Sequence, residues 1–199
     1  TREWYIEHFG RYRIGNTLDA AIGQGNTRVT LLQLALAYGA LANGGSLYAP
    51  MIIDSIREED GTLVEEFQPQ VRRQLDITEE HLALIHQGLW GAVNAQNGTA
   101  YDARIAGGVE IAGKTGTAEI AAGVPRENID PRRAWYFQRS HAWFAGYAPA
   151  DDPEVAIVVL VEHGGGGGRA AAPIGVRVLE EYLGSRGSVT AQNTHGGAR

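Results

Sequence analysis

Ile111-Ala-Gly-Lys-Thr-Gly-Thr-Ala118 is the most informative segment of this 199-residue sequence. It lies within a longer run, 109–120, whose alternating side chains predict one β-strand interrupted by two glycines. A glycine inside a strand lets another backbone approach closely, as a bound substrate would. The segment therefore predicts either a strand with one solvated lysine or one edge of a catalytic site.

Four consecutive residues of this segment carry groups that serine acyl transfer requires: Lys114, Thr115, Gly116 and Thr117. Strand alternation puts Lys114 and Gly116 on one side and the two threonines on the other. The reaction needs a cation beside the nucleophile, a hydroxyl that holds a substrate carboxylate, and a backbone N–H that stabilises the tetrahedral oxyanion. Lys-Thr-Gly is also a signature of serine acyltransferases that bind β-lactams.

The same region formally matches a phosphate-binding loop, because Gly108 and the later run Gly113-Lys-Thr115 satisfy the G-x-x-x-x-G-K-[ST] pattern. A phosphate loop needs a flexible interior whose N–H groups surround the phosphate. Here the interior, 109–112, alternates like a strand, and Gly116 interrupts the helix that should follow. We therefore expect no nucleotide site.

The rest of the chain predicts an α+β fold with an antiparallel sheet and helices packed on it. Helices are expected at residues 1–10, 31–43, from 79 (with Leu82, Ile85, Leu89 and Val93 at helical spacing) and from Pro173 (burying Ile174, Val178, Leu179 and Tyr182). Thr30 and Gln33 have the spacing of a capping box. Helix 31–43 is apolar on almost every side, so we expect it to be buried.

Extended segments are expected in two regions. Short ones lie between 47 and 74, including Met51-Ile-Ile53, with a turn at Asp60-Gly61. Two longer strands are expected at His141–Ala148 and Val155–Glu162. Residues 121–140 are expected to form a polar loop. We divide the chain into one domain, 1–183, and a flexible C-terminal tail, 184–199.

Composition excludes several classes of protein. The net charge is −6 and no basic face is evident, which argues against a nucleic-acid partner. The chain has no cysteine, so it forms no disulfide. No apolar run reaches the roughly 18 residues that a membrane span needs. No His, Asp and Glu cluster has ligand spacing, so we expect neither a metal nor a cofactor.

Four blocks of the sequence carry a family resemblance: Ile22-Gly-Gln-Gly25 with the helix after it, Lys114-Thr-Gly-Thr-Ala118, His141–Pro149 and Pro153–Glu162. In this order they resemble class B penicillin-binding proteins, and most closely the elongation-type transpeptidases of the penicillin-binding protein 2 group. The first block resembles the family's segment that follows the Ser-x-Asn motif, the second resembles the third motif, and the last two resemble the next two strands. The resemblance covers residues 1–183 and implies part of a penicillin-binding, serine β-lactamase-like transpeptidase fold.

The resemblance implies a peptidoglycan D,D-transpeptidase that acts through a serine ester on D-Ala-D-Ala stem peptides. Lys114 would lie beside the nucleophile, tune proton transfer and help to fix the substrate carboxylate. Thr115 would hold that carboxylate, and Gly116 would leave room for the substrate. Thr117 would give its backbone N–H to the oxyanion hole. The expected catalytic residues are thus Lys114 and Thr117, within a substrate-binding run 114–117.

The resemblance further implies β-lactams as ligands and a membrane glycosyltransferase and elongation-complex proteins as partners. It implies a place on the periplasmic side of the cytoplasmic membrane, with an anchor in an N-terminal segment that is not present in this chain.

Two motifs of the family are missing from the sequence. Lys114 is the only lysine and is preceded three residues earlier by Ile111, so no Ser-x-x-Lys exists, and no Ser-x-Asn occurs. We expect the nucleophile to precede Thr1, and the chain alone to be inactive and to expose apolar surface. The link from Gly10 to Gly15 is shorter than the corresponding link in the family. This indicates either a true deletion or a junction at which intervening residues have been left out of the sequence.

Two other functions stay open. A serine β-lactamase needs a base, such as a glutamate, that activates the water for deacylation. Asn94–Gly98 and Asp102 offer no clear glutamate of this kind, so this function is disfavoured. A non-catalytic module that binds peptidoglycan or a cell-wall partner is the other alternative.

The remaining aromatic and histidine residues are interpreted as follows. His141 is expected to be structural rather than directly catalytic, His81 and His86 to be surface residues, and His163 to be a loop residue. The cluster at 135–137 (Trp, Tyr and Phe) is expected either to roof a cleft or, with preference, to pack as a small satellite core.

Overall fold

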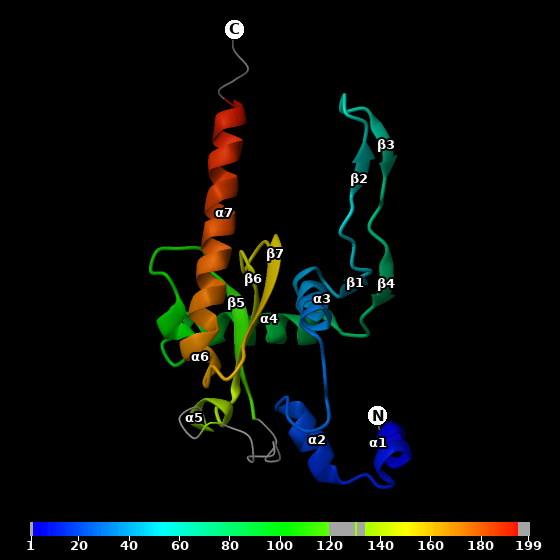
Figure 1. The fold of residues 1–199 in the computed structure, drawn as a ribbon, viewed down its shortest axis with the longest axis vertical. Coiled ribbons are helices and arrows are strands. Elements are labelled where there is room, and N and C mark those ends of the chain that lie inside the picture. Colours follow the sequence, from blue (N-terminus) through cyan, green and yellow to red (C-terminus); the bar gives the residue numbers. More distant parts are fainter. Residues whose placement is uncertain (1, 120–129, 131–133, 195–199) are drawn as a thin grey trace.

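The computed structural model describes residues 2–119, 130 and 134–194. Its elements are, in order, α1 (Arg2–Phe9), α2 (Ile14–Ala21), α3 (Leu31–Ala42), β1 (Ser46–Tyr48), β2 (Ser55–Arg57), β3 (Leu63–Glu66), β4 (Val71–Gln74), α4 (Glu79–Asn94), the 3-10 helix η1 (Tyr101–Ala103), β5 (Ala112–Ala118), α5 (Ala134–Phe137), β6 (His141–Ala148), β7 (Val155–Val161), α6 (Gly167–Ala170) and α7 (Ala172–Thr194). The predicted α+β class and its antiparallel sheet are confirmed (Figure 1).

The main sheet is three-stranded, with the order β5-β6-β7 and antiparallel pairing throughout. β5 starts at Ala112 and not at Val109 as predicted, because the preceding residues turn. Gly107 has a φ of +76°, and the N–H of Val109 donates to the Glu180 carboxylate of α7 (2.8 Å) instead of to a strand. β6 and β7 lie where the sequence predicted them.

Two hydrophobic clusters cover the two faces of this sheet. Phe144 of β6 packs with Val176 and Leu179 of α7 on one face, and all three are at most 1% exposed. Tyr147 of β6 packs with Leu41 of α3 on the other face. Figure 1 shows α7 and α3 on opposite sides of the sheet. The site described below therefore lies on a strand that is supported from both faces.

Helix α7 buries a different face from the one predicted. Ile174, Val178 and Tyr182 are 47%, 50% and 39% exposed, whereas Leu179 is buried as predicted and Val176 is buried with it. The helix carries apolar residues on two sides, and the sheet covers only one of them, so periodicity alone could not choose between them. The helix also continues to Thr194, through part of the predicted tail.

Helix α3 begins with the predicted capping box. The Thr30 hydroxyl accepts from the Gln33 N–H (3.2 Å), and the Gln33 side chain accepts from the Thr30 N–H (2.9 Å). The prediction that this helix is buried is wrong, because Ala40 is its one buried residue and Leu32 is 56% exposed. The exposed side of α3 matches the apolar surface expected for this chain.

Helix α4 begins after Thr78, as the sequence predicted, and the Thr78 hydroxyl accepts from the N–H of His81 (3.2 Å). Leu89 and Val93 are buried, while Ile85 is 36% exposed. The two buried residues belong to different clusters, so α4 lies beside β5 and supports both faces of the sheet.

Residues 46–74 form an arm of two short antiparallel pairs, β1 with β4 and β2 with β3, which projects away from the main sheet (Figure 1). The predicted turn at Asp60-Gly61 is present, since the Gly61 N–H donates to the Glu58 carbonyl (2.9 Å). The predicted strand at Met51-Ile-Ile53 is absent, and Ile52 is 99% exposed. Among the described helices, none has both the length and the apolar composition needed to cross a bilayer.

Candidate active site

The four-residue run Lys114–Thr117 lies on β5, which is an edge strand whose one neighbour among the described strands is β6. In an antiparallel ladder, the N–H and C=O groups of one residue point to the same side. Three odd-numbered residues in and just before β5 direct their carbonyls away from β6, and side chains donate hydrogen bonds to them. Asn94 Nδ2 donates to the Ile111 carbonyl (2.9 Å), Lys114 Nζ to that of Thr115 (3.0 Å) and Gln24 Nε2 to that of Thr117 (3.1 Å). The N–H of Thr117 therefore also points to the free edge.

The register shows which face each side chain occupies. Thr115 pairs with Phe144, which packs against α7, so the Thr115 side chain lies on the α7 face. Lys114 pairs with Ala145, which shares a face with Tyr147 and hence with α3 and α4. The predicted alternation of lysine and threonine is confirmed.

Lys114 is exposed, and its ammonium group donates to the Thr115 carbonyl. Among the described residues, no carboxylate forms an ion pair with it. The free edge of β5 thus offers a cation and an outward backbone N–H within four residues. These are two of the groups that serine acyl transfer needs beside a nucleophile.

The Thr115 hydroxyl has a partner that the sequence did not indicate. It donates to the Thr99 hydroxyl (2.8 Å), and Thr99 is itself exposed. Thr99 lies five residues after the end of α4 and belongs to no motif, so the one available signal was its position after a helix end.

Glycines bring α6 directly against the sheet at this point. A Cβ on Gly167 would collide with the backbone oxygens of Gly116 and Trp143, and a Cβ on Gly168 would collide with that of Thr99. A Cβ on Gly116 would lie 3.1 Å from the Cβ of Trp143. The glycine-rich turn before α7 therefore supports the back of the Lys114–Thr117 run.

Two histidines, one at the start of β6 and one just after β7, contact each other. The His141 ring nitrogen Nδ1 accepts from the His163 N–H (3.0 Å), and His163 lies against Tyr136 with ring centroids 4.8 Å apart. This agrees with a structural role for His141. Trp135 is 61% exposed, so it does not form the preferred satellite core, and the Phe137 side chain lies outside the described residues.

His86 is not the surface residue that was predicted, whereas His81 is exposed. One His86 ring nitrogen, Nε2, lies 3.0 Å from the Leu41 carbonyl, and the other, Nδ1, lies 2.7 Å from the Tyr147 hydroxyl. A carbonyl can only accept, so Nε2 carries the proton and Nδ1 accepts from Tyr147. Burial, and after it the charge of Tyr38, raises the pKa of Tyr147 to about 12.

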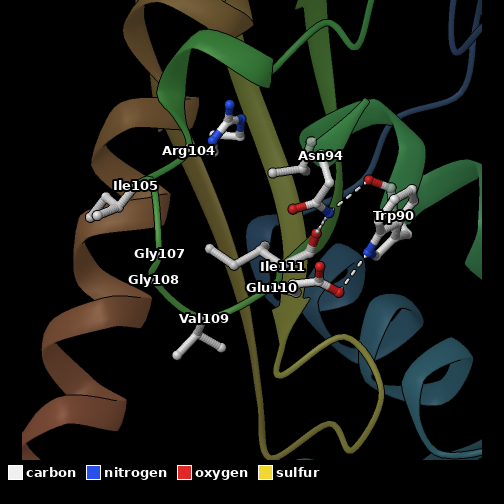
Figure 2. Close-up of a pocket in the computed structure, with 10 residues that line it drawn as sticks. Trp90, Asn94, Arg104, Ile105, Gly107, Gly108, Val109, Glu110 and Ile111 are labelled. Atoms are coloured by element: carbon white, nitrogen blue, oxygen red, sulfur yellow. Dashed lines mark hydrogen bonds between the residues drawn. The ribbon is translucent and has the colours of Figure 1, made fainter. Parts of the chain in front are cut away.

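A cavity of about 280 Å³ lies at the upstream end of β5, between α4 and residues 104–111 (Figure 2). The Trp90 indole N–H donates to the Glu110 carboxylate (2.9 Å) in its wall. None of the four residues Lys114–Thr117 lines this cavity, so the candidate site is the open edge of β5 and not an enclosed pocket. In the described part of the chain, no group of three His, Asp or Glu side chains could hold a metal ion.

The chain is similar to known proteins over almost its whole length. The family model described as the penicillin binding protein transpeptidase domain matches residues 2–180. The peptidoglycan D,D-transpeptidase MrdA of Haemophilus influenzae is 33% identical over 190 residues, which cover 94% of this chain and 29% of that protein. This chain thus spans less than a third of that relative.

Two solved structures share the fold. Penicillin-binding protein A from M. tuberculosis, as an imipenem acyl-enzyme complex, has a TM-score of 0.66 and 30% identity over 83% of this chain and 33% of its own. The complex of penicillin-binding protein 2 with MreC from Helicobacter pylori has a TM-score of 0.64 and 28% identity over 90% of this chain and 29% of the matched one.

Proposed function

Because this chain belongs to the penicillin-binding protein transpeptidase family, we propose that it is the C-terminal part of a peptidoglycan D,D-transpeptidase of the class B, elongation type. One observation carries the proposal: the Lys114 side chain and the outward N–H of Thr117 share the free edge of β5. The relatives' names support the reaction. The division into a domain, 1–183, and a tail belongs to the same proposal.

The reaction is acyl transfer in two steps. A serine hydroxyl attacks the carbonyl between the two D-alanines of a stem peptide and gives up its proton. The peptide bond breaks, and the terminal D-alanine leaves with a proton on its new amine. An amine of a neighbouring stem then attacks the serine ester, forms the cross-link and returns a proton to the serine oxygen.

Each residue of the Lys114–Thr117 run contributes to these steps. The Lys114 charge favours proton transfer from the nucleophile and attracts the substrate carboxylate. The Thr117 N–H donates to the oxyanion of each tetrahedral intermediate. The Thr115 hydroxyl holds the substrate carboxylate, and Gly116 keeps the strand free of a side chain where the substrate lies alongside it.

The nucleophile itself must come from elsewhere in the complete protein. This sequence has neither Ser-x-x-Lys nor Ser-x-Asn, and this chain corresponds to 29% of the relative from Haemophilus influenzae. We therefore place the serine on residues that precede Thr1, and we expect the chain of 199 residues to be inactive by itself.

Ligands and partners follow from the same relatives. The M. tuberculosis protein forms an acyl-enzyme with imipenem, which supports β-lactams as covalent inhibitors here. The Helicobacter pylori protein forms a complex with MreC, which supports elongation-complex partners. A membrane glycosyltransferase partner and an N-terminally anchored, periplasmic location are parts of this proposal as well.

The proposal is tested by incubating the complete protein with a D-Ala-D-Ala pentapeptide donor and an amine acceptor. Mass spectrometry should detect released D-alanine together with a cross-linked product. Binding of the pentapeptide without D-alanine release would instead favour the non-catalytic module. Rapid turnover of a chromogenic cephalosporin, without any cross-linked product, would favour the serine β-lactamase.

A further inference from the structure

We propose that Thr99, which lies outside the Lys114–Thr117 run, is a positioning residue that sets how Thr115 recognises the substrate carboxylate. The inference rests on the proposed transpeptidase function and adds a specificity determinant to it. Its starting observation is the hydrogen bond between the two hydroxyls, in which Thr115 Oγ1 lies 2.8 Å from Thr99 Oγ1.

Thr99 is held firmly enough to position a neighbour. The N–H of Ala100 donates to the Ala92 carbonyl (2.9 Å), the N–H of Gly98 donates to the Ala95 carbonyl (2.8 Å), and Ala100 is 1% exposed. Gly98 lies so close to α4 that a Cβ on it would be 2.5 Å from the Ala92 oxygen. The backbone of Thr99 is thus fixed on both sides, while its side chain stays exposed.

The Thr115 side is fixed as well. Thr115 lies in the middle of β5 and pairs with Phe144, which is fully buried. Gly168 of α6 packs beside both residues, because a Cβ there would collide with the Thr99 carbonyl and lie 3.8 Å from Thr115 Cγ2. The two hydroxyls therefore meet through rigid backbones on both sides, and their separation does not depend on a mobile loop.

A hydroxyl has one proton to donate and can rotate to aim it. In the structure, the Thr115 hydroxyl donates its proton to Thr99. When a carboxylate binds, Thr115 turns its proton to the carboxylate, and Thr99 donates to the Thr115 oxygen in return. The resulting chain of donors strengthens the bond to the carboxylate, because successive hydrogen bonds polarise each other. Thr99 thus acts through Thr115 and never contacts the substrate.

This arrangement makes a prediction that a purely structural role does not make. If Thr99 only supported the strand, its loss would slow acylation by charged and neutral substrates alike. If it acts on carboxylate recognition, its loss should affect carboxylate substrates selectively. Benzylpenicillin and its methyl ester form a suitable pair of probes, since they differ in that one group.

The experiment measures second-order acylation rate constants of the complete protein with both probes. For Thr99→Val, we expect the constant for benzylpenicillin to fall about fivefold, the effect of one lost hydrogen bond, and that for the ester to stay within about twofold. Thr99→Ser keeps the hydroxyl and should restore the wild-type ratio of the two constants. Because Thr99 acts through Thr115, the double variant Thr115→Val with Thr99→Val should show the same ratio of the benzylpenicillin and ester constants as Thr115→Val alone. The exposed Thr62, between β2 and β3 of the arm, provides the control Thr62→Val.

Equal losses for both probes in Thr99→Val, or no loss for either, would overturn the inference while leaving the transpeptidase proposal intact. A wild-type protein that neither probe acylates would overturn the proposed function and the inference with it. If Thr99→Val does not fold, Thr99→Ala is measured instead, with the same criteria.

Discussion

The side-chain amide of Gln24 donates a hydrogen bond to the backbone carbonyl of Thr117 across 3.1 Å, although the two residues are 93 positions apart in the sequence. The contact ties the segment between α2 and α3 to the free edge of β5. Because the N–H of Thr117 points to the same edge, the contact also helps to fix the group that we assign to the oxyanion hole.

Removing this donor should slow acylation. Gln24→Glu keeps the shape of the side chain but puts an acceptor against the Thr117 carbonyl, so the two oxygens repel each other. We expect the acylation rate constant of the complete protein with benzylpenicillin to fall about fivefold to tenfold. The exposed Gln87 allows the matched control Gln87→Glu, which introduces the same charge. Equal rates in Gln24→Glu and wild type would show that the contact does not support the site.

Lys114 should be the most sensitive residue of the chain. Lys114→Gln removes the positive charge that we place beside the nucleophile, so acylation should slow by about 10²–10³-fold, the range for loss of one stabilising group. Lys114→Arg keeps the positive charge but changes the shape of the side chain and the geometry of its donors. Its acylation rate should therefore lie between those of wild type and Lys114→Gln. Stopped-flow acylation measures all three proteins. A Lys114→Gln rate within about threefold of wild type would remove Lys114 from the mechanism.

The close packing of α6 on β5 predicts opposite outcomes for two neighbouring glycines. Gly167→Ala inserts a methyl group into the backbone oxygens of Gly116 and Trp143, and should lower the free energy of unfolding by about 1–3 kcal/mol. Gly166 has open space around its Cβ position and an ordinary φ of −85°. Gly166→Ala should therefore change that free energy by less than about 0.5 kcal/mol. Chemical denaturation of the complete protein distinguishes the two, and equal effects would contradict the packing described here.

Tyr147 makes stability depend on pH at the alkaline end. Burial raises its pKa from 10.0 to about 12, so the phenol ionises more readily in the unfolded chain than in the folded one. Its contribution to stability is fully present below pH 10 and is lost as the pH rises toward 12. Tyr147→Phe should lower the free energy of unfolding by about 1 kcal/mol at pH 7, through loss of the bond to His86.

The measurement for Tyr147 compares urea denaturation of the two proteins between pH 9 and pH 11, about one unit on each side of the usual tyrosine pKa. The free energy of unfolding should fall less steeply with pH in Tyr147→Phe than in wild type. Tyr48→Phe, at a more exposed tyrosine, is the control. Parallel pH profiles for wild type and Tyr147→Phe would contradict the raised pKa.

Local signals predicted much of the fold. Thr30 and Gln33 form a capping box because their spacing in the sequence is the spacing of the interaction, and α4 starts directly after Thr78, where the sequence placed it. The strands β6 and β7 were also predictable, since β6 is rich in aromatic and small apolar residues, β7 is apolar throughout, and a turn joins them.

Features that depend on distant neighbours could not be predicted. Met51-Ile-Ile53 has strand-like residues, but none of the strands in the described part of the chain pairs with it. The side of α7 that is buried depends on where the sheet lies. His86 is part-buried because it bonds to Tyr147 of β6, which lies 61 positions away in the sequence. The same holds for the site, where the Lys114–Thr117 run was evident from the sequence while its partners Thr99 and Gln24 were not.

The central claim is that this chain supplies the Lys-Thr-Gly edge of a transpeptidase site whose serine lies on residues preceding Thr1. Intact mass spectrometry after incubation with excess benzylpenicillin tests it most directly, on the purified chain Thr1–Arg199 and on the complete protein in parallel. The account predicts one penicilloyl adduct on the complete protein and none on the chain. An adduct on the chain itself, or none on the complete protein, would contradict it.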